Sequence, residues 1–120
     1  MKAMILDAPG NPLRLAELPI PEYGSNQMLI KIHACGVCRT DLHIIDGELK
    51  NPKLPLILGH EIVGEVAAID DQVKRFAVGQ RVGVPWLGHT CERRRYCTSS
   101  RKNLCDEARF TGYSISLSIV

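Results

Sequence analysis

Short apolar runs, separated by prolines and glycines, make up most of the first 84 residues. From Met28 to Ala34 the residues Met28, Ile30, Ile32 and Ala34 alternate with Leu29, Lys31 and His33. This period of two predicts a half-buried strand. Further strands are expected at Lys2–Leu6, Leu13–Leu18, Ile62–Ile69 and Val82–Val84.

Turn-forming residues separate these runs. Pro9-Gly10-Asn11-Pro12 predicts a turn that pairs the second strand back on the first, and Asp70-Asp71 turns the chain again. Gly64 interrupts its apolar run, which is typical of a place where a ligand or another backbone approaches closely. Thr40–Ile45 predicts one or two helical turns, which Gly47 ends. Many short strands with turns between them indicate a mostly β barrel or sandwich.

The pattern changes between Gly88 and Asp106. Cysteines, arginines and small polar residues replace aliphatic ones, so this segment can bury little. We expect an irregular, cysteine-bearing lobe here. In the tail, Ser114–Val120 alternates serine with Ile115, Leu117 and Ile119, which predicts an edge-like strand.

Length and composition set the class of protein. The 120 residues, 45% hydrophobic and 23% charged, fit one folded domain. The net charge of +2 predicts neither nucleic acid nor membrane as a partner. Because the sequence has no signal-peptide pattern and no apolar run near the roughly 20 residues of a membrane span, we expect a cytoplasmic protein. Its five cysteines are then expected to be metal ligands or free thiols, not a disulfide framework.

Cys38, His60 and Glu61 offer a thiolate, an imidazole and a carboxylate, which are ligand types that zinc takes. No local spacing rule links Cys38 to His60, so the residues alone leave another interpretation open: a buried thiol, a core histidine and a salt-bridged glutamate. Cys35-Gly-Val-Cys38 also has the spacing of a thioredoxin-like redox pair, but its flanks lack the βαβ setting of that motif.

Three further cysteines, Cys91, Cys97 and Cys105, fall within fifteen residues of the lobe and suggest a structural metal site. A closed structural zinc has four ligands, however. The arginines around them are typical of a solvated face, and without interleaved aromatic residues they do not favour nucleic-acid binding. The sequence contains no glycine-rich nucleotide motif.

The stretches ACGVCRTDLH (34–43) and LGHEIVGEV (58–66) resemble the two signatures of the zinc-dependent, medium-chain alcohol dehydrogenases. PWLGHTC and NLCDEARFTGY resemble the stretches that follow, so the resemblance runs from Met1 to about Tyr113. It implies a GroES-like β fold over residues 1–113, with the lobe at 88–106, a divergent tail at 114–120 and no Rossmann domain.

The resemblance also implies roles for single residues. Cys38 and His60 match ligands of the catalytic zinc, and Glu61 matches a carboxylate beside the metal that exchanges with water. Thr40 matches the hydroxyl that takes the proton of the substrate, and His43 matches the next member of that relay. In the family, zinc polarises an alcohol, which becomes an aldehyde or ketone as hydride passes to NAD(P).

Other matches are less complete. Trp86 falls where the family often lines its substrate pocket. Cys91, Cys97 and Cys105 match three of the four ligands of the structural zinc, but Arg94 stands in the place of the fourth. Because a guanidinium cannot ligate and repels the metal, we expect the lobe to bind zinc weakly or not at all. Neither His89 nor Asp106 has a spacing that supports it as a substitute.

Two smaller departures concern the backbone. Asp70 and Ser100 stand where the family frequently has glycine. Aspartate tolerates left-handed turn geometry, so Asp70 is expected to cost little, whereas Ser100 is expected to add strain.

The sequence ends before the βαβ units of a dinucleotide domain and before the third protein ligand that the family gives its catalytic zinc. We therefore expect a truncated or frame-shifted catalytic-domain fragment. The alternative is a non-catalytic zinc-binding or regulatory remnant. A co-chaperonin-like ring subunit is disfavoured because such a ring has no use for the metal-type residues. The expected partner is a small-molecule alcohol or aldehyde, and exposed apolar surface predicts oligomers or aggregation.

Overall fold

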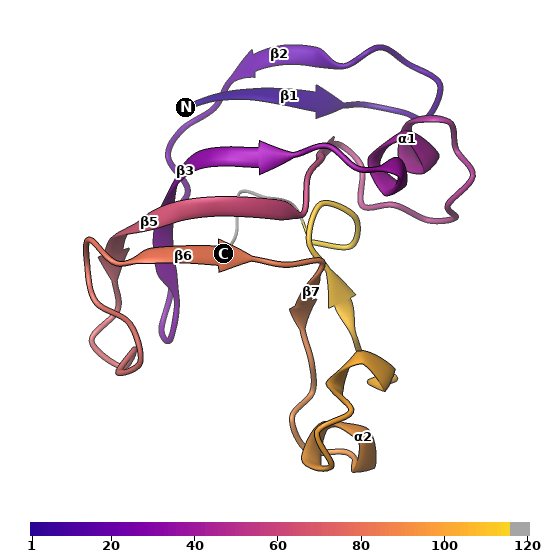
Figure 1. The fold of residues 1–120 in the computed structure, drawn as a ribbon. Coiled ribbons are helices and arrows are strands. Elements are labelled where there is room, and N and C mark those ends of the chain that lie inside the picture. Colours follow the sequence, from indigo (N-terminus) through magenta and orange to yellow (C-terminus); the bar gives the residue numbers. More distant parts are fainter. Residues whose placement is uncertain (116–120) are drawn as a thin grey trace.

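The computed structural model describes residues 1–115, which form two three-stranded antiparallel sheets and one two-stranded sheet (Figure 1). The first has the order β2-β1-β4, formed by β1 (Lys2–Leu6), β2 (Arg14–Glu17) and β4 (Leu56–Ile57). The second has the order β3-β5-β6, formed by β3 (Met28–Gly36), β5 (Glu61–Ile69) and β6 (Arg81–Val84). The predicted pairing of the first two strands is confirmed, with Ala3 opposite Ala16.

The lobe projects away from both sheets (Figure 1). It contains the helix α2 (Arg95–Thr98) and the 3-10 turn Lys102–Leu104, and the antiparallel pair of β7 (Leu87–His89) and β8 (Arg109–Phe110) closes its base. The mostly β class with an irregular lobe is therefore confirmed. These lobe elements, like β4, have two to four residues each and escaped prediction because a period cannot be recognised over so short a run.

The predicted helical turns are present as α1 (Arg39–Ile45). Cys38 begins the helix: its sulfur accepts a hydrogen bond from the Thr40 N–H, and the Asp41 carboxylate accepts one from the Cys38 N–H. This reciprocal cap satisfies two backbone donors that a helix start leaves free. Gly47, with φ of 78°, lets the chain leave the helix as expected. Among the described residues, no helix is long and apolar enough to cross a membrane.

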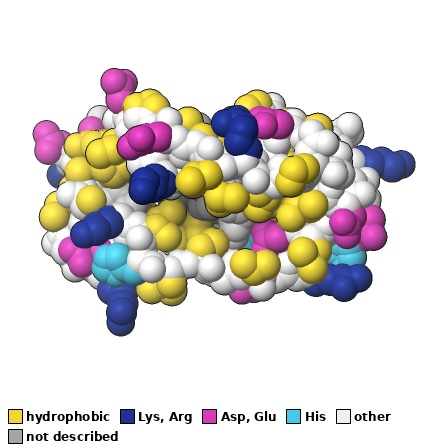
Figure 2. Space-filling view, turned by 90° about the horizontal axis from the view of Figure 1, so that it is seen from above, with side chains coloured by type: hydrophobic (Ala, Val, Ile, Leu, Met, Phe, Trp, Pro, Cys, Tyr) yellow, Lys and Arg dark blue, Asp and Glu magenta, His cyan; other side chains and the backbone are white. Residues whose placement is uncertain are grey.

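The fully buried core is small. Leu6 of β1, Ile44 of α1 and Leu56 of β4 pack together and thereby tie the helix to the first sheet. The second sheet does not share this packing. An open cavity of about 800 Å³ lies beside it, lined by apolar residues that include Met4, Leu29, Ile32 and Val84. Figure 2 shows a hollowed face with hydrophobic side chains gathered around the hollow.

This cavity corrects the prediction for β3. Met28–Ile30 and Gly36 are half-buried, whereas residues 31–35 are exposed, and Ile32 has 46% of its surface exposed. The strand was predicted correctly, but its burial does not alternate: register shifts interrupt its pairing, and the apolar Ile32 lines the open cavity instead of a filled core. The expected association through exposed apolar surface stays a prediction.

The features expected at three loop and strand positions have different outcomes. Gly64 lies inside an unbroken β5, and a Cβ there would stand 2.6 Å from the Lys31 carbonyl oxygen, so the close backbone approach is confirmed. Ser100 has φ of 61°, a conformation that favours glycine. Asp70 is not among the described residues with positive φ; instead, its carboxylate accepts hydrogen bonds from the N–H groups of Asn26 and Gln72. Beyond Ile115, the strand predicted for the tail lies outside the described residues.

Candidate functional site

Cys38 and His60, 22 residues apart in sequence, meet at one end of α1. The Cys38 sulfur lies 2.9 Å from Nε2 of His60. The cap that begins α1 fixes Cys38, and His60 sits directly before β5 with 5% of its surface exposed. The fold therefore holds a thiol and an imidazole face to face in a mostly buried setting.

Asp41 completes this group and was not predicted. Its Oδ1 lies 3.4 Å from Nδ1 of His60, on the side of the ring away from Cys38. In the described part of the chain neither of these buried atoms has a hydrogen-bond partner. The donor atoms of Cys38, Asp41 and His60 lie within 4.8 Å of one another, which is compatible with a metal ion. The signal in the sequence was the C-x-x-D spacing, which is that of a helix cap.

Glu61 points elsewhere. In β5 the side chains alternate, and Glu61 is on the exposed face. It pairs with Gly36 of β3, and a Cβ on Gly36 would stand 2.5 Å from its carboxylate oxygen. Of the three residues predicted at the catalytic zinc, the described group therefore contains Cys38 and His60, with Asp41 in the third place.

Thr40 and His43 lie three residues apart on α1, a spacing that places them on one side of the helix. Nδ1 of His43 contacts the carboxylate of Glu48 at the molecular surface. His43 thus lies at the solvent side of the group, while the backbone of Thr40 contacts the Cys38 sulfur.

Aromatic rings form a wall beside His60. Trp86 meets the imidazole edge-on, with ring centroids 4.8 Å apart. Phe110 stacks on Trp86 at 4.8 Å, and Tyr113 stacks at 5.9 Å. The sequence singled out Trp86 alone, because Phe110 and Tyr113 approach it only through the pairing of β7 with β8.

The Cys35–Cys38 pair does not have the character of a redox site. The Cys35 sulfur contacts the carbonyl oxygen of Gly36 at 3.6 Å, whereas the Cys38 sulfur faces His60. Desolvation by the surrounding protein atoms raises the pKa of the Cys35 thiol, and reactive pairs of this spacing have a thiol of lowered pKa.

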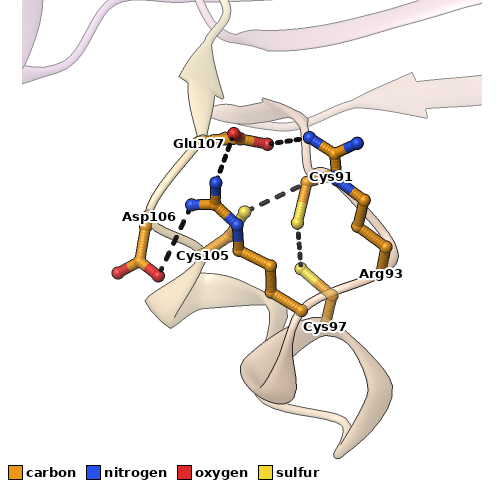
Figure 3. Close-up of polar contacts among 7 residues, drawn as sticks. Cys91, Arg93, Cys97, Cys105, Asp106 and Glu107 are labelled. Carbon is orange, nitrogen blue, oxygen red and sulfur yellow. Dashed lines mark hydrogen bonds and ion pairs between the residues drawn. The ribbon is translucent and has the colours of Figure 1, made fainter.

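The lobe brings its three cysteines together (Figure 3). The sulfurs of Cys91 and Cys97 are 3.6 Å apart, and the Cys91 N–H donates to the Cys105 sulfur at 3.4 Å. Cys97 and Cys105 are buried, and Cys91 is half-buried. The N–H groups of Arg93 and Arg94 lower the pKa of the Cys91 thiol to about 7, whereas burial raises that of Cys97.

Arg94 does not approach the sulfurs as a ligand. Its guanidinium donates to the Glu107 carboxylate at 2.7 Å and lies 3.9 Å from the Asp106 carboxylate. Arg93 contacts the same Glu107 at 3.4 Å. These ion pairs join the two limbs of the lobe, 91–95 and 105–107 (Figure 3).

Residues 24–118 match the family model of the alcohol dehydrogenase GroES-like domain. The chain belongs to this family. An alcohol dehydrogenase of Geobacillus stearothermophilus is 41% identical over 116 residues, which are 96% of this chain and 34% of the relative. An alcohol dehydrogenase of Rhizobium meliloti (strain 1021) is 43% identical over 116 residues, with the same coverage.

Solved structures agree with this assignment. The crystal structure of AibC superposes with a TM-score of 0.90 at 33% identity, covering 97% of this chain and 33% of that one. A zinc-binding dehydrogenase of Sinorhizobium meliloti 1021 bound to NADP superposes with a TM-score of 0.85 at 35% identity, covering 96% and 33%. This GroES-like domain therefore spans about a third of the length of the relatives it matches.

The two cysteine groups of the GroES-like domain differ in their fit to zinc. In the first group, the Cys38 sulfur and Nε2 of His60 lie close together, and Nδ1 of His60 faces the Asp41 carboxylate. A carboxylate in this position orients a metal-binding histidine. At the second, three sulfurs converge where a closed structural zinc needs four ligands, and Arg94 pairs with acidic residues. The residues of the first group fit zinc, and those of the lobe do not fit a closed zinc site.

Proposed function

We propose that this chain is the zinc-carrying catalytic domain of an alcohol dehydrogenase, with Cys38 and His60 as zinc ligands. The observation that supports this most directly is the 2.9 Å approach of the Cys38 sulfur to Nε2 of His60. When bound, zinc supplies Lewis acidity that lets an alcohol lose its hydroxyl proton near neutral pH. Metal binding would replace the present contact between the two side chains.

Asp41 acts on His60 as a positioning residue. Because Nδ1 of His60 faces Asp41, Nε2 is left to bind the metal. A carboxylate behind a ligating imidazole fixes its orientation and raises its basicity. Glu61 is proposed as the carboxylate that exchanges with water beside the metal, although its side chain lies against Gly36 in this conformation.

The proton released by the alcohol would leave along α1. The Thr40 hydroxyl can accept one proton while donating its own. His43, one turn further on, can carry a proton to the surface, where it contacts Glu48. The order of Thr40 and His43 on α1 supports proton transfer in this direction, from the buried group to the surface.

The aromatic wall indicates the kind of alcohol. Trp86 meets His60, and Phe110 and Tyr113 stack on Trp86, so the substrate would carry a hydrocarbon group beside its hydroxyl carbon. The product is the corresponding aldehyde or ketone. We infer that the hydride acceptor is NAD(P), because one similar structure is named an NAD-dependent alcohol dehydrogenase and another was solved with NADP.

Hydride transfer and zinc binding are separate tests. The zinc-loaded chain would be mixed with a series of alcohols and NAD⁺ or NADP⁺, and reduced cofactor would be followed by absorbance. Turnover that disappears in Cys38→Ser supports the enzyme. Zinc binding without turnover supports the alternative of a non-catalytic zinc-binding remnant. A chain that binds no zinc through Cys38 and His60 would contradict both.

A further inference from the structure

The lobe brings together three sulfur atoms that could bind a metal ion, those of Cys91, Cys97 and Cys105. The three sulfurs lie within 4.8 Å of one another, and two of them are buried, with 6% and 8% of the surface of Cys97 and Cys105 exposed. Two thiolates on one ion, each bonded at about 2.3 Å, are separated by roughly 4 Å. The sulfurs therefore need only small movements to share an ion.

The residue at the position of a fourth ligand, Arg94, cannot bind a metal ion. Arg94 has no lone pair to offer, and its guanidinium is held by Glu107 at 2.7 Å with Asp106 beside it. Zinc on three sulfurs would keep an open fourth position, as catalytic zinc does, and lose the closed shell of a structural site. In a lobe with four cysteines, the metal ion would join the two limbs. Here the ion pair of Arg94 joins them instead.

We propose that Cys91, Cys97 and Cys105 form a three-thiolate site for a soft, low-coordinate ion, Cu(I), and not for zinc. Thiolate sulfur is a soft ligand that takes both Cu(I) and zinc, so the number of ligands decides between the two ions. Cu(I) is also stable with three sulfur ligands and requires no fourth. Binding involves no change of oxidation state: each thiol that ligates releases one proton to solvent.

The charge of the lobe suits this ion. Three thiolates and one Cu(I) leave two negative charges. Residues 88–107 contain five arginines and lysines against three acidic side chains. Of these, Lys102 pairs with Glu92, and Arg94 pairs with Glu107 across the lobe. Arg95 and Arg101 add further positive charge to the same loop, so the lobe counters the negative charge of the filled site.

The test uses the full chain carrying Cys38→Ser, which removes the other sulfur site and makes the result independent of the proposed catalytic zinc. Cu(I) is titrated without oxygen against a coloured chelator that competes for it, and zinc is titrated in the same way. We expect one Cu(I) per chain and zinc affinity at least 100-fold lower. Cys97→Ser should weaken Cu(I) binding at least tenfold, and if that variant fails to fold, the half-buried Cys91→Ser decides.

Arg94→Cys provides the matched comparison. It should restore tight zinc binding at one additional zinc per chain, whereas Arg95→Cys, which adds a cysteine one position away, should not. The proposal is overturned if the unaltered lobe binds zinc as tightly as the Arg94→Cys lobe. It is also overturned if Cu(I) does not bind, or binds equally well after loss of Cys97 or Cys91.

Discussion

Nδ1 of His60 lies 3.4 Å from Oδ1 of Asp41, and both atoms are buried. Asp41 also accepts a hydrogen bond from the Cys38 N–H at 2.9 Å. One carboxylate thus contacts the two residues that we propose as zinc ligands, through the backbone of one and the ring of the other.

We therefore expect Asp41→Asn to weaken zinc binding by about 10-fold or more, in line with partners that orient metal ligands elsewhere. The amide keeps the size of the side chain but removes the charge behind His60. Competition with a chelator measures the zinc affinity. Asp46→Asn, at the exposed opposite end of α1, is the control and should leave the affinity unchanged. Equal affinities for both variants would remove Asp41 from the account.

Gly112, which follows β8, lies against Gly59, the residue before His60. A Cβ on Gly112 would stand 2.3 Å from the Gly59 carbonyl oxygen, and its φ is 68°. We expect Gly112→Ala to lower the free energy of unfolding by about 2–4 kcal/mol, from backbone strain and overpacking together. Urea denaturation measures this. Gly79→Ala has a similar φ of 85° but open space around the new Cβ, so it should lose only about 1 kcal/mol. A loss as small in Gly112→Ala would show that the contact with Gly59 does not matter.

Ser100 lies in the left-handed region with φ of 61°. Glycine removes the steric cost of that conformation, so Ser100→Gly should raise the free energy of unfolding by up to about 1 kcal/mol. The neighbouring Ser99, with φ of −111°, gains nothing from glycine, and Ser99→Gly should lower stability by about 0.5–1 kcal/mol. Thermal or urea unfolding of the two variants compares them. The same sign of change in both would contradict the assignment of strain to Ser100.

Asp70 joins the turn after β5 to the loop before β3, because its carboxylate accepts the N–H groups of Asn26 and Gln72 at 3.0 and 3.1 Å. These hydrogen bonds lower the pKa of Asp70 in the folded chain. A lowered folded-state pKa gives stability that is present above the unfolded value, about 3.9, and is lost as pH falls through the folded value. The free energy of unfolding of the wild type should therefore exceed that of Asp70→Asn above about pH 4, and the difference should shrink as the pH falls further. Urea midpoints of the two proteins at a series of pH values would measure it. A constant difference between the two proteins at all pH values would count against this role.

Elements that carry a period could be predicted from the sequence, and short or context-dependent ones could not. The alternation in β3 and the apolar run of β5 specified two strands of one sheet. The two residues of β4 carry no period, and their pairing with Leu6 and Ile5 of β1 depends on the rest of the fold. Burial was also misjudged where Ile32 faces a cavity, because a sequence pattern gives the face of a strand but not what covers it.

The same limit applies to the site. Cys38 and His60 were identified by resemblance, and their approach over 22 residues of sequence is a consequence of tertiary structure. Asp41 was missed because the sequence near it indicates only the cap to Cys38, whereas its contact with His60 depends on the tertiary structure. Arg94 was singled out from the sequence, but its pairing with Glu107 could not be predicted because it depends on the return of the chain to β8 at the end of the lobe.

The central claim is that Cys38 and His60 hold one zinc ion, and the number of zinc ions per chain tests it most directly. Native mass spectrometry of the zinc-loaded chain should show one zinc, and Cys38→Ser should show none. Cys35→Ser, which changes the exposed cysteine of the same stretch, should keep it. A chain without zinc, or a zinc that persists in Cys38→Ser, would contradict the account.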